Sequence, residues 1–519
     1  MQEAFCSVPS TTINAASFDE RNYCDGLQQL DGPVSAVSGA KPPYATCDTC
    51  KNNCNHLPLL QCGKTVEYPR ILGEESLRIF TLLRLIVPYI PDSNQLSWQK
   101  AAGMYQACLS FTSSYETETQ YLVEWMRSLN LDFLNKTRLK KVNPVEMMVR
   151  GSVDLGVEAV IAIVFSKKYF KNNKRGMKLV EFTEPYMFLR DRSASDACYS
   201  HVRKVMNLAV LSPYFHSEIP PYIVPQAQRM VSEVRNAFLK ALESSSWLGL
   251  KIREAAIRKL KNMTSYVGSP GRRSDPEFVE SVYKPYPDAP LDILFPTWIK
   301  ALSLSSHYIW TDQETRLYDE ARRSPYYTDN YNDFTIPATS LIRPFMYYGI
   351  TSLNYGGLGK LIGHEIMHGF DVNAIESLKD NDPEGMKNVR KEYTKRALCL
   401  RESHKSVLFI NGQEEILNET LDSENLADFV GTKIGYDAFV SLVPENRDET
   451  LAGLDMSAEQ LFFFNSCAIM CAQHGIPGQR YAPYRSRCMV PLINMPEFSR
   501  AFGCAAGTPM NPRKKCTFW

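Results

Sequence analysis

The 519-residue sequence lacks an apolar run long enough to cross a bilayer. Its most apolar stretch, residues 77–90, is interrupted by Arg78 and Arg84, whereas a membrane-spanning helix needs about 20 consecutive apolar residues. The first residues also lack the basic segment and apolar run that make up a secretory signal. We therefore expect no membrane span in this chain, and any signal or membrane anchor would lie outside it.

The sequence also has almost no excess of charge. Its 58 Lys and Arg residues nearly balance 57 Asp and Glu residues, so the formal net charge is +1. Contacts with the phosphates of nucleic acid depend on a basic excess, and nucleic acid is therefore excluded as the expected partner. At roughly 150 residues per domain, the length predicts two to four units.

Cysteine, by contrast, is abundant, with 14 residues gathered mainly near the two ends. An even number in a chain of this kind favours a disulfide framework and an oxidising, extracellular environment. Cys47 and Cys50 also have the spacing of a zinc ribbon or a redox pair, but no matching second pair follows. Sequons at Asn135, Asn262 and Asn418 add slight support for a secreted glycoprotein. We expect an extracellular protein, either secreted or the ectodomain of a membrane-anchored one.

The spacing of apolar residues is mostly helical. It predicts helices within residues 74–131, 225–242 and 248–263. The β-branched run 157–165 predicts a buried strand, and residues 178–182 predict a second one. The sequence therefore predicts a mainly α protein with a small β-sheet, an α+β fold.

Three further segments are expected to connect or precede helices. Residues 268–290 are rich in Pro, Gly, Ser and Asp and predict an irregular connection. Residues 335–338 predict an edge strand. Residues 354–357 (Asn-Tyr-Gly-Gly) predict a turn that leads into a helix.

Residues 364–368 (His-Glu-Ile-Met-His) carry the pattern of a metal-binding helix. Positions i and i+4 share one face of a helix, so the imidazoles of His364 and His368 can reach one ion. Glu365 lies beside the first ligand, where its carboxylate can take a proton from zinc-bound water. This pattern alone also occurs by chance on solvated helices, so a third ligand is needed.

A third ligand is available downstream, in residues 423–428 (Ser-Glu-Asn-Leu-Ala-Asp). Glu424 and Asp428 are again four residues apart and share one helix face. We expect Glu424 to bind the ion and Asp428 to accept the second N–H of a ligand histidine. Three protein ligands leave a position open for water, as catalytic zinc requires, whereas a structural zinc site would need a fourth protein ligand.

With these motifs, the sequence resembles the neprilysin family of membrane or secreted zinc endopeptidases. The resemblance also covers residues 246–247 (Ser-Trp), 354–357, 460–465 (Gln-Leu-Phe-Phe-Phe-Asn) and 497–519. It implies one Zn²⁺ ion per chain, peptide substrates and a thermolysin-like (gluzincin) catalytic domain. It also implies a reduced helical second domain, because the long helical insert of the family is largely missing within residues 185–198.

The resemblance also suggests an organisation along the chain. The expected parts are a disulfide-rich amino-terminal segment at 1–65, a remnant of the amino-terminal peptidase region at 66–200, a helical connecting region at 201–300 and the zinc-binding catalytic domain at 301–519. The implied disulfides are Cys54–Cys504, Cys62–Cys471, Cys108–Cys198 and Cys399–Cys516. The cysteines that remain unassigned are Cys6, Cys24, Cys47, Cys50, Cys467 and Cys488.

Several residues would contact a substrate if the resemblance holds. The family grips the substrate backbone with an Asn-Ala pair, and Ser324 and Pro325 occupy the aligned positions, where proline removes a donor. The family's oxyanion-stabilising histidine corresponds to Tyr481, whose phenol is still a donor, accompanied by Arg487. Three residues fall where the family has apolar pocket walls, although each suits an ordinary core role equally well: Phe345, Ile469 and Met470.

Two main hypotheses follow. The first is a zinc metalloendopeptidase that cleaves peptides on the amino side of apolar residues, with Glu365 assisting the attack of zinc-bound water and with Tyr481 and Arg487 steadying the oxyanion. The second is a zinc-loaded peptide-binding homologue, because the altered anchor, Tyr481 and the missing insert would attenuate or abolish turnover. A third, a fragment that does not fold stably, would be contradicted by a cooperative thermal transition.

Overall fold

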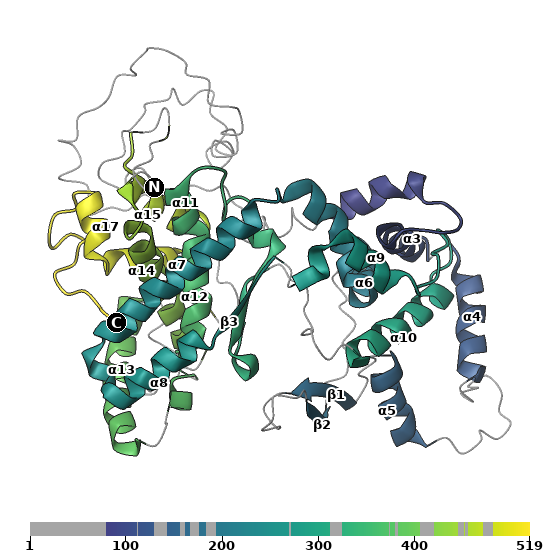
Figure 1. Cartoon of the computed structure of the whole chain (residues 1–519), viewed down its shortest axis with the longest axis horizontal. Helices are drawn as coiled ribbons and strands as arrows, with labels where there is room; N and C mark the ends of the chain where they lie inside the picture. The colour runs from purple at the N-terminus through teal and green to yellow at the C-terminus, as the bar shows by residue number, and fades with distance from the viewer. Residues whose placement is uncertain are drawn as a thin grey trace, which may run out of the picture. The chain divides into compact units, whose positions relative to one another are not determined.

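The computed structural model describes residues 79–111, 113–128, 143–155, 161–166, 176–182, 194–268, 271–311, 324–372, 374–378, 382–404, 420–444, 451, 455–470 and 481–519. These residues form two compact units, which are mostly helical (Figure 1). Unit 1 comprises residues 221–267 and 324–519, and unit 2 comprises residues 79–220 and 268–323. Each unit therefore joins segments that are distant in sequence, whereas the segments expected from sequence are contiguous. No described helix is both long and apolar enough to span a membrane.

Unit 1 is built mainly of helices. They are α7 (Ile223–Ser244), α8 (Leu250–Lys261), α11 (Thr351–Asn354), α12 (Lys360–His368), α13 (Pro383–Ser403), α14 (Leu421–Val440), α15 (Ala458–Ala468), α16 (Tyr484–Ile493) and α17 (Pro496–Ala501). The strands are β3 (Thr264–Gly268), β4 (Tyr326–Thr328) and β5 (Asp333–Pro337). Short 3₁₀ helices occupy Ser246–Leu248, Asp329–Tyr331, Ala338–Ser340 and Ile375–Leu378. Helices α7, α12 and α14 pack against one another (Figure 1), and α7 and α8 confirm the helices predicted at 225–242 and 248–263.

Unit 2 is a helical assembly with a two-stranded sheet. Its helices are α3 (Ser97–Leu109), α4 (Tyr115–Ser128), α5 (Pro144–Leu155), α6 (Ala194–Glu218), α9 (Pro276–Tyr283) and α10 (Phe295–Thr311), with 3₁₀ helices at Val87–Tyr89 and Gly271–Ser274. The antiparallel strands β1 (Ile161–Ser166) and β2 (Gly176–Phe182) confirm the two strands predicted from sequence. Helix α3 packs on α6, and the disulfide Cys108–Cys198 joins them. The predicted fold class, mainly α with a small β component, is confirmed.

The sheet of unit 1 has the strand order β3–β5–β4. Its middle strand, β5, has all five residues buried. The edge strand expected at residues 335–338 is therefore wrong in position, because this segment lies in the centre of the sheet and its last residue begins a 3₁₀ helix. The strand β4, which follows Pro325, lies at an edge instead and pairs antiparallel with β5.

Residues 268–290, expected to be irregular, contain helix α9. Asp275 caps this helix, because its carboxylate accepts a hydrogen bond from the backbone N–H of Glu277 at 3.0 Å. Pro276 occupies the first helical position, where the missing N–H of proline costs nothing. The Asp and Pro residues that suggested an irregular connection act here as helix-starting residues.

The turn expected at residues 354–357 is a continuous helical segment. Helix α11 runs through a π-helical stretch, Tyr355–Gly359, directly into α12. A Cβ on Gly356 would lie 2.2 Å from the carbonyl oxygen of Phe462. The glycine is therefore needed because a neighbouring backbone lies against the helix, and it does not break the helix.

Helices α12 and α14 cross in direct backbone contact. A Cβ on Gly431 would lie 2.6 Å from the backbone nitrogen of His364, and a Cβ on Gly363 would lie 2.9 Å from Cα of Gly431. Because neither glycine carries a side chain, nothing separates the two helices at the crossing. This contact sets the polar residues of α14 beside those of α12.

The last residues of the sequence pack into the core of unit 1. Trp519 stacks on Trp247 with ring centroids 5.6 Å apart, and it also contacts Phe238 and Phe370. Trp247 Nε1 donates a hydrogen bond to the carbonyl oxygen of Phe518 at 3.1 Å. Phe370 follows shortly after α12, so this aromatic cluster secures the end of that helix.

Two disulfides lie among the described residues of unit 1. Cys399 on α13 is bonded to Cys516, and Cys467 on α15 is bonded to Cys488 on α16. Cys399–Cys516, like Cys108–Cys198 of unit 2, is a pair that the family resemblance implies. The resemblance leaves Cys467 and Cys488 unassigned. Cys504 is buried and bonded to no other described cysteine. The cysteines outside the described residues, which include the partner implied for Cys504, are Cys6, Cys24, Cys47, Cys50, Cys54, Cys62 and Cys471.

Candidate metal centre

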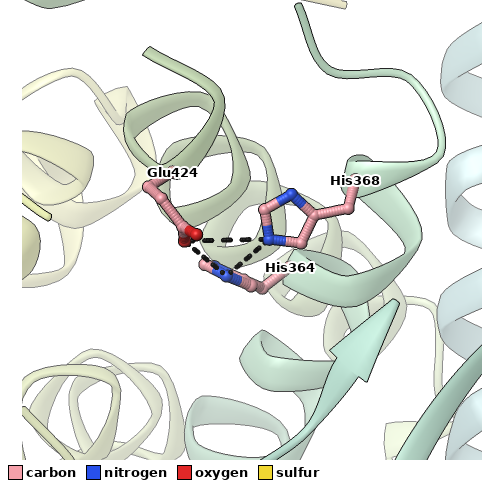
Figure 2. A group of neighbouring side chains, drawn as sticks. All are labelled: His364, His368 and Glu424. Carbon is pink, nitrogen blue, oxygen red and sulfur yellow. Dashed lines mark hydrogen bonds and ion pairs between the residues drawn. The ribbon is translucent and has the colours of Figure 1, made fainter. Parts of the chain in front are cut away.

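Two histidines of α12 and one glutamate of α14 direct their side chains toward a common point (Figure 2). Nε2 of His364 lies 3.2 Å from Nε2 of His368 and 3.3 Å from Oε2 of Glu424. Nε2 of His368 lies 3.7 Å from the same oxygen. The three side chains are 8%, 10% and 2% exposed, respectively. The structure thus brings together the three residues that the sequence nominates as ligands.

The spacing of these three atoms fits a zinc ion. A tetrahedral ion with bonds of about 2.0–2.1 Å separates its ligand atoms by about 3.3–3.4 Å, and two of the three separations, 3.2 and 3.3 Å, are close to this value. Imidazole nitrogen and carboxylate oxygen are also donors that zinc favours in catalytic sites. His364, His368 and Glu424 would therefore hold the ion with three protein ligands.

Each histidine is held by a carboxylate on its other ring nitrogen. Nδ1 of His364 lies 3.1 Å from Oδ1 of Asp428, and Nδ1 of His368 lies 3.0 Å from Oδ2 of Asp371. When Nδ1 carries the proton, Nε2 keeps its lone pair for a metal. Sequence reasoning nominated Asp428 for this position but missed Asp371, although its spacing of three residues from His368 was an available signal.

Arg487 on α16 holds Asp428 through two hydrogen bonds. Its Nε and Nη2 donate to Oδ2 and Oδ1 of Asp428 at 2.6 and 3.0 Å. The guanidinium carbon lies 4.4 Å from the ring centroid of Tyr481, which is a cation–π contact. The structure therefore places Arg487 beside Tyr481, with the guanidinium fork directed at a carboxylate of the metal centre.

The buried charges of the centre stabilise one another. Burial opposes the charged form of Asp428, yet Arg487 and His364 hold the pKa of its carboxyl far below its usual range. Burial also opposes charge on Glu424, and hydrogen bonding to His364 outweighs it and lowers the pKa of that carboxyl to about 2. With no metal bound, burial disfavours the imidazolium of His364, but Asp428 and Glu424 prevail and raise its pKa to about 10. The centre therefore favours a positive charge between its ligands.

Three further ionisable groups are buried around the centre. Glu365, which the sequence nominates as a proton acceptor, is 5% exposed, and its charge helps to raise the pKa of His364. Lys360, one turn before His364, donates a hydrogen bond from Nζ to the carbonyl oxygen of Ser466 at 2.9 Å, and burial lowers its pKa to about 8. Burial also lowers the pKa of His404, at the end of α13, to about 4. Sequence reasoning singled out neither Lys360 nor His404.

The three residues expected to line an apolar pocket belong to one buried cluster. Its members are Phe345, Leu361, Ile469, Met470 and Tyr484. Because Leu361 lies on α12, the cluster packs against the helix that carries the two histidines. The exposed fractions of 2%, 0% and 4% for Phe345, Ile469 and Met470 suit both a pocket wall and a core position.

The expected substrate anchor lies directly before the edge strand β4. Ser324 and Pro325 are both partly exposed, and Tyr326 is the first residue of the strand. The anchor position is therefore next to a sheet edge, which is where an extended peptide could be added as a further strand.

Two histidines on one helix, a glutamate on a second helix and no fourth protein ligand among the described residues are the features of a catalytic zinc centre. Two family models, both described as Peptidase family M13, match residues 188–270 and 324–518. The chain belongs to this family, which confirms the resemblance to the neprilysins.

Named relatives cover the same part of the chain. Neprilysin-1 of Trittame loki is 28% identical over 360 residues, which is 64% of this chain and 49% of that protein. Endothelin-converting enzyme 1 of Cavia porcellus is 29% identical over 314 residues, which is 56% of this chain and 41% of that protein. The chain thus spans about half the length of these relatives, or less.

Solved structures support the fold. A zinc metalloprotease of Mycobacterium tuberculosis, seen in its open state by electron cryo-microscopy, matches with a TM-score of 0.52 at 20% identity over 64% of this chain and 53% of that chain. A galactose-containing glycoprotein complex of Haemonchus matches with a TM-score of 0.52 at 19% identity, over 64% of this chain and 55% of that chain. At this level of identity the likeness concerns the fold alone.

Proposed function

We propose that this protein is a zinc-dependent metalloendopeptidase that hydrolyses peptides on the amino side of apolar residues. The observation that carries the proposal is the convergence of His364, His368 and Glu424 at separations that suit zinc, with Glu365 buried on the same helix. Family membership supports the same conclusion, since M13 proteins are described as peptidases.

The residues around the ligands have distinct roles in this proposal. An ion held by His364, His368 and Glu424 would supply Lewis-acid chemistry, which polarises a peptide carbonyl and makes water more acidic. Glu365 accepts the proton of the attacking water and returns it to the leaving amine, as a general base and then a general acid. Asp428 and Asp371 keep the proton of each ligand histidine on Nδ1.

Tyr481 and Arg487 are the proposed stabilisers of the oxyanion. The phenol of Tyr481 supplies a donor, and the contact with the guanidinium of Arg487 fixes the ring. Because the guanidinium fork of Arg487 is occupied by Asp428, the larger contribution of Arg487 is to position that carboxylate. Loss of an oxyanion donor costs about 10²–10³ in rate, so Tyr481→Phe is the variant that measures this role.

Substrate binding is proposed to use the sheet edge and the apolar cluster. An extended peptide would pair with the outer edge of β4, and the side chain after the scissile bond would rest against Phe345, Ile469 and Met470. Pro325, which has no N–H, cannot contribute a backbone donor beside Ser324. We therefore expect weak binding of the peptide backbone and high KM values for short peptides.

The disulfides support an extracellular location. Three of them lie within the described residues, at Cys108–Cys198, Cys399–Cys516 and Cys467–Cys488. Such bridges persist in oxidising compartments and are rare in the cytosol. We propose that the protein is secreted or belongs to the outer part of a membrane-anchored protein.

The test compares Glu365→Gln with the unaltered protein on quenched peptides that contain apolar residues. Cleavage that is removed by a chelator and restored by zinc is expected in the unaltered protein, and the variant should lose about 10²–10⁴ in kcat. Glu254→Gln, at an exposed position of α8 in the same unit, is the matched control and should retain full activity. Metal analysis should find one zinc per chain in all three proteins.

The second hypothesis, a zinc-loaded binding protein, predicts a different result. The unaltered protein would then contain one zinc and bind the same peptides, but its cleavage rate would equal that of Glu365→Gln. The altered positions Pro325 and Tyr481 are the observations that favour it. Equal, chelator-insensitive rates in both proteins would rule out the peptidase.

A further inference from the structure

The disulfide Cys467–Cys488 joins two helices that border the metal centre. Cys467 lies in the last turn of α15 and is 1% exposed, and Cys488 lies on the first half of α16. The two Cα atoms are 4.9 Å apart and the cysteines are 21 residues apart in sequence. The family resemblance assigns no partner to either cysteine, so this bridge is unexplained by what the resemblance implies.

The bridge is connected to a zinc ligand through a short chain of contacts. Cys488 is the immediate neighbour of Arg487, whose guanidinium holds both oxygens of Asp428. Asp428 in turn bonds to Nδ1 of His364. Helix α15 is therefore linked to His364 by the disulfide, by the hydrogen bonds from Arg487 to Asp428, and by the contact of Asp428 with His364.

Helix α16 depends on such contacts for its position. It has only 10 residues and contains Pro491, and a helix of this length is marginal by itself in water. Packing of Cys488 against the apolar cluster that includes Phe345 and Leu361 holds its first half. The covalent bond adds a fixed point next to Arg487, at the place where the fork of the guanidinium must be aligned with a buried carboxylate.

We propose that the Cys467–Cys488 bridge is a positioning element of the metal centre, which acts through Arg487 and Asp428 and makes metal retention sensitive to thiol reductants. This proposal rests on the zinc centre of the proposed function and not on peptide cleavage. A dithiol reductant reacts in two steps. One thiolate attacks a sulfur of the bridge to form a mixed disulfide, and the second thiolate then displaces the protein sulfur. The bridge gains two electrons and two protons to become two thiols, and the reductant becomes a cyclic disulfide.

The first measurement is the zinc dissociation constant of the oxidised, full-length protein, obtained by competition with a chromophoric chelator. Loss of a partner that orients a zinc-bound histidine typically weakens zinc binding by about 10–100-fold. We expect Cys467→Ala/Cys488→Ala to weaken it by about 10-fold, because Asp428 becomes less well aligned. Alanine is preferred to serine because Cys467 is buried and a hydroxyl there would add an unpaired polar group. An unchanged dissociation constant in a variant that unfolds cooperatively would overturn the proposal.

The second measurement separates positioning from general stabilisation. Arg487→Lys keeps the positive charge but loses the two-pronged contact with Asp428. If the bridge acts through this contact, removal of the bridge from the Arg487→Lys protein should weaken zinc binding by less than about 2-fold. The reason is that the effects of two substitutions are not additive when the residues act in series. A further loss as large as in the unaltered protein would show that the bridge only stabilises the fold, and would overturn the proposal.

The matched control is Cys108→Ala/Cys198→Ala, which removes a bridge of unit 2. It should leave the zinc dissociation constant unchanged, whereas an equal loss in this variant would contradict a specific role for Cys467–Cys488. Reduction of the unaltered protein with dithiothreitol, which is then removed because a dithiol itself binds zinc, should weaken zinc binding by about 10-fold. The same treatment should leave the zinc dissociation constant of the Cys467→Ala/Cys488→Ala variant unchanged, although that variant keeps Cys108–Cys198 and Cys399–Cys516. Zinc affinity is measured without a substrate. A protein that cleaves no peptide would therefore refute the peptidase proposal, whereas the zinc dissociation constants would still decide the role of the Cys467–Cys488 bridge.

Discussion

The two ring nitrogens of each ligand histidine have different tasks. Nδ1 contacts a carboxylate, which belongs to Asp428 for His364 and to Asp371 for His368. Nε2 of each histidine faces the proposed metal position. A carboxylate on Nδ1 selects the tautomer that a metal needs and increases the basicity of the other nitrogen. The affinity of the centre should therefore depend on residues that never touch the ion.

Asp371→Asn is expected to weaken zinc binding by about 10-fold. The amide oxygen can still accept a hydrogen bond from Nδ1 of His368, but the negative charge that supports the imidazole is lost. Chelator competition measures the effect. Asp329→Asn is the control, since the side chain of Asp329 is 64% exposed and lies 3.7 Å from Lys259 in an ion pair. Equal zinc affinity in the two variants would contradict the role assigned to Asp371.

At this scale, residue spacing explains what the sequence could predict. His364 and His368, and likewise Glu424 and Asp428, are each four residues apart, so a helix brings the members of each pair to one face. The convergence of the two pairs is seen in the structure. Lys360 also has this spacing before His364, but a lysine at such a position is usually solvent-exposed and gives no sign of burial.

At the scale of elements, the crossing of α12 and α14 determines the geometry of the centre. Gly431 lies on α14 between the residues that face α12, and its Cα is adjacent to Gly363. Any side chain at this point would separate the helix that carries the histidines from the helix that carries Glu424. The approach of the two helices is therefore part of the metal centre.

Gly431→Ala is expected to lower the free energy of unfolding by about 1–3 kcal/mol, as overpacking does in a tight core, and to weaken zinc binding. The new Cβ would lie 2.6 Å from the backbone nitrogen of His364, which cannot move without displacing the ligand. Gly435→Ala is the graded control, because its Cβ would lie 3.1 Å from the backbone nitrogen of Lys360. Denaturant unfolding and chelator competition measure both quantities, and equal effects of the two variants would contradict this account.

Two of the wrong predictions have the same cause, because each depends on contacts with residues that are distant in sequence. A glycine can indicate either a turn or close packing, and the sequence does not distinguish the two. Residues 354–357 are expected to form a turn, but they are helical, and Gly356 is needed because the backbone of Phe462 lies against it. The place of a strand in a sheet depends on distant partners, and β5 becomes central only because β3 pairs with its free side. Helices α7 and α8 were predictable because their apolar spacing is a local property.

At the scale of the whole molecule, zinc binding should contribute to stability, and this contribution should depend on pH. In the metal-free protein, the pKa of His364 is raised to about 10. Its protonated form therefore contributes stability that is complete below the unfolded-state pKa of about 6.5 and is lost as the pH rises towards 10. Zinc must displace this proton, so the proton competes more strongly at low pH.

We expect zinc to raise the midpoint of thermal unfolding, and to raise it less at pH 6 than at pH 8. If zinc displaces one proton, zinc affinity falls about tenfold for each unit by which the pH is lowered. At saturating zinc, each such unit removes about 1.4 kcal/mol of the stabilisation that zinc gives. Scanning calorimetry with zinc and with chelator at each pH measures the difference. Titration in buffers of different ionisation enthalpy gives the number of protons released, and a value of zero would contradict this prediction.

The aromatic cluster at the end of the sequence has a consequence for biosynthesis. The ribosome produces His364, His368 and Glu424 before it produces Arg487 and Trp519, which align Asp428 and secure the end of α12. The ligands are thus exposed on the nascent chain before the residues that orient them exist. The metal centre should therefore mature only once Arg487 and Trp519 have been synthesised, and a shorter nascent chain should hold zinc only weakly.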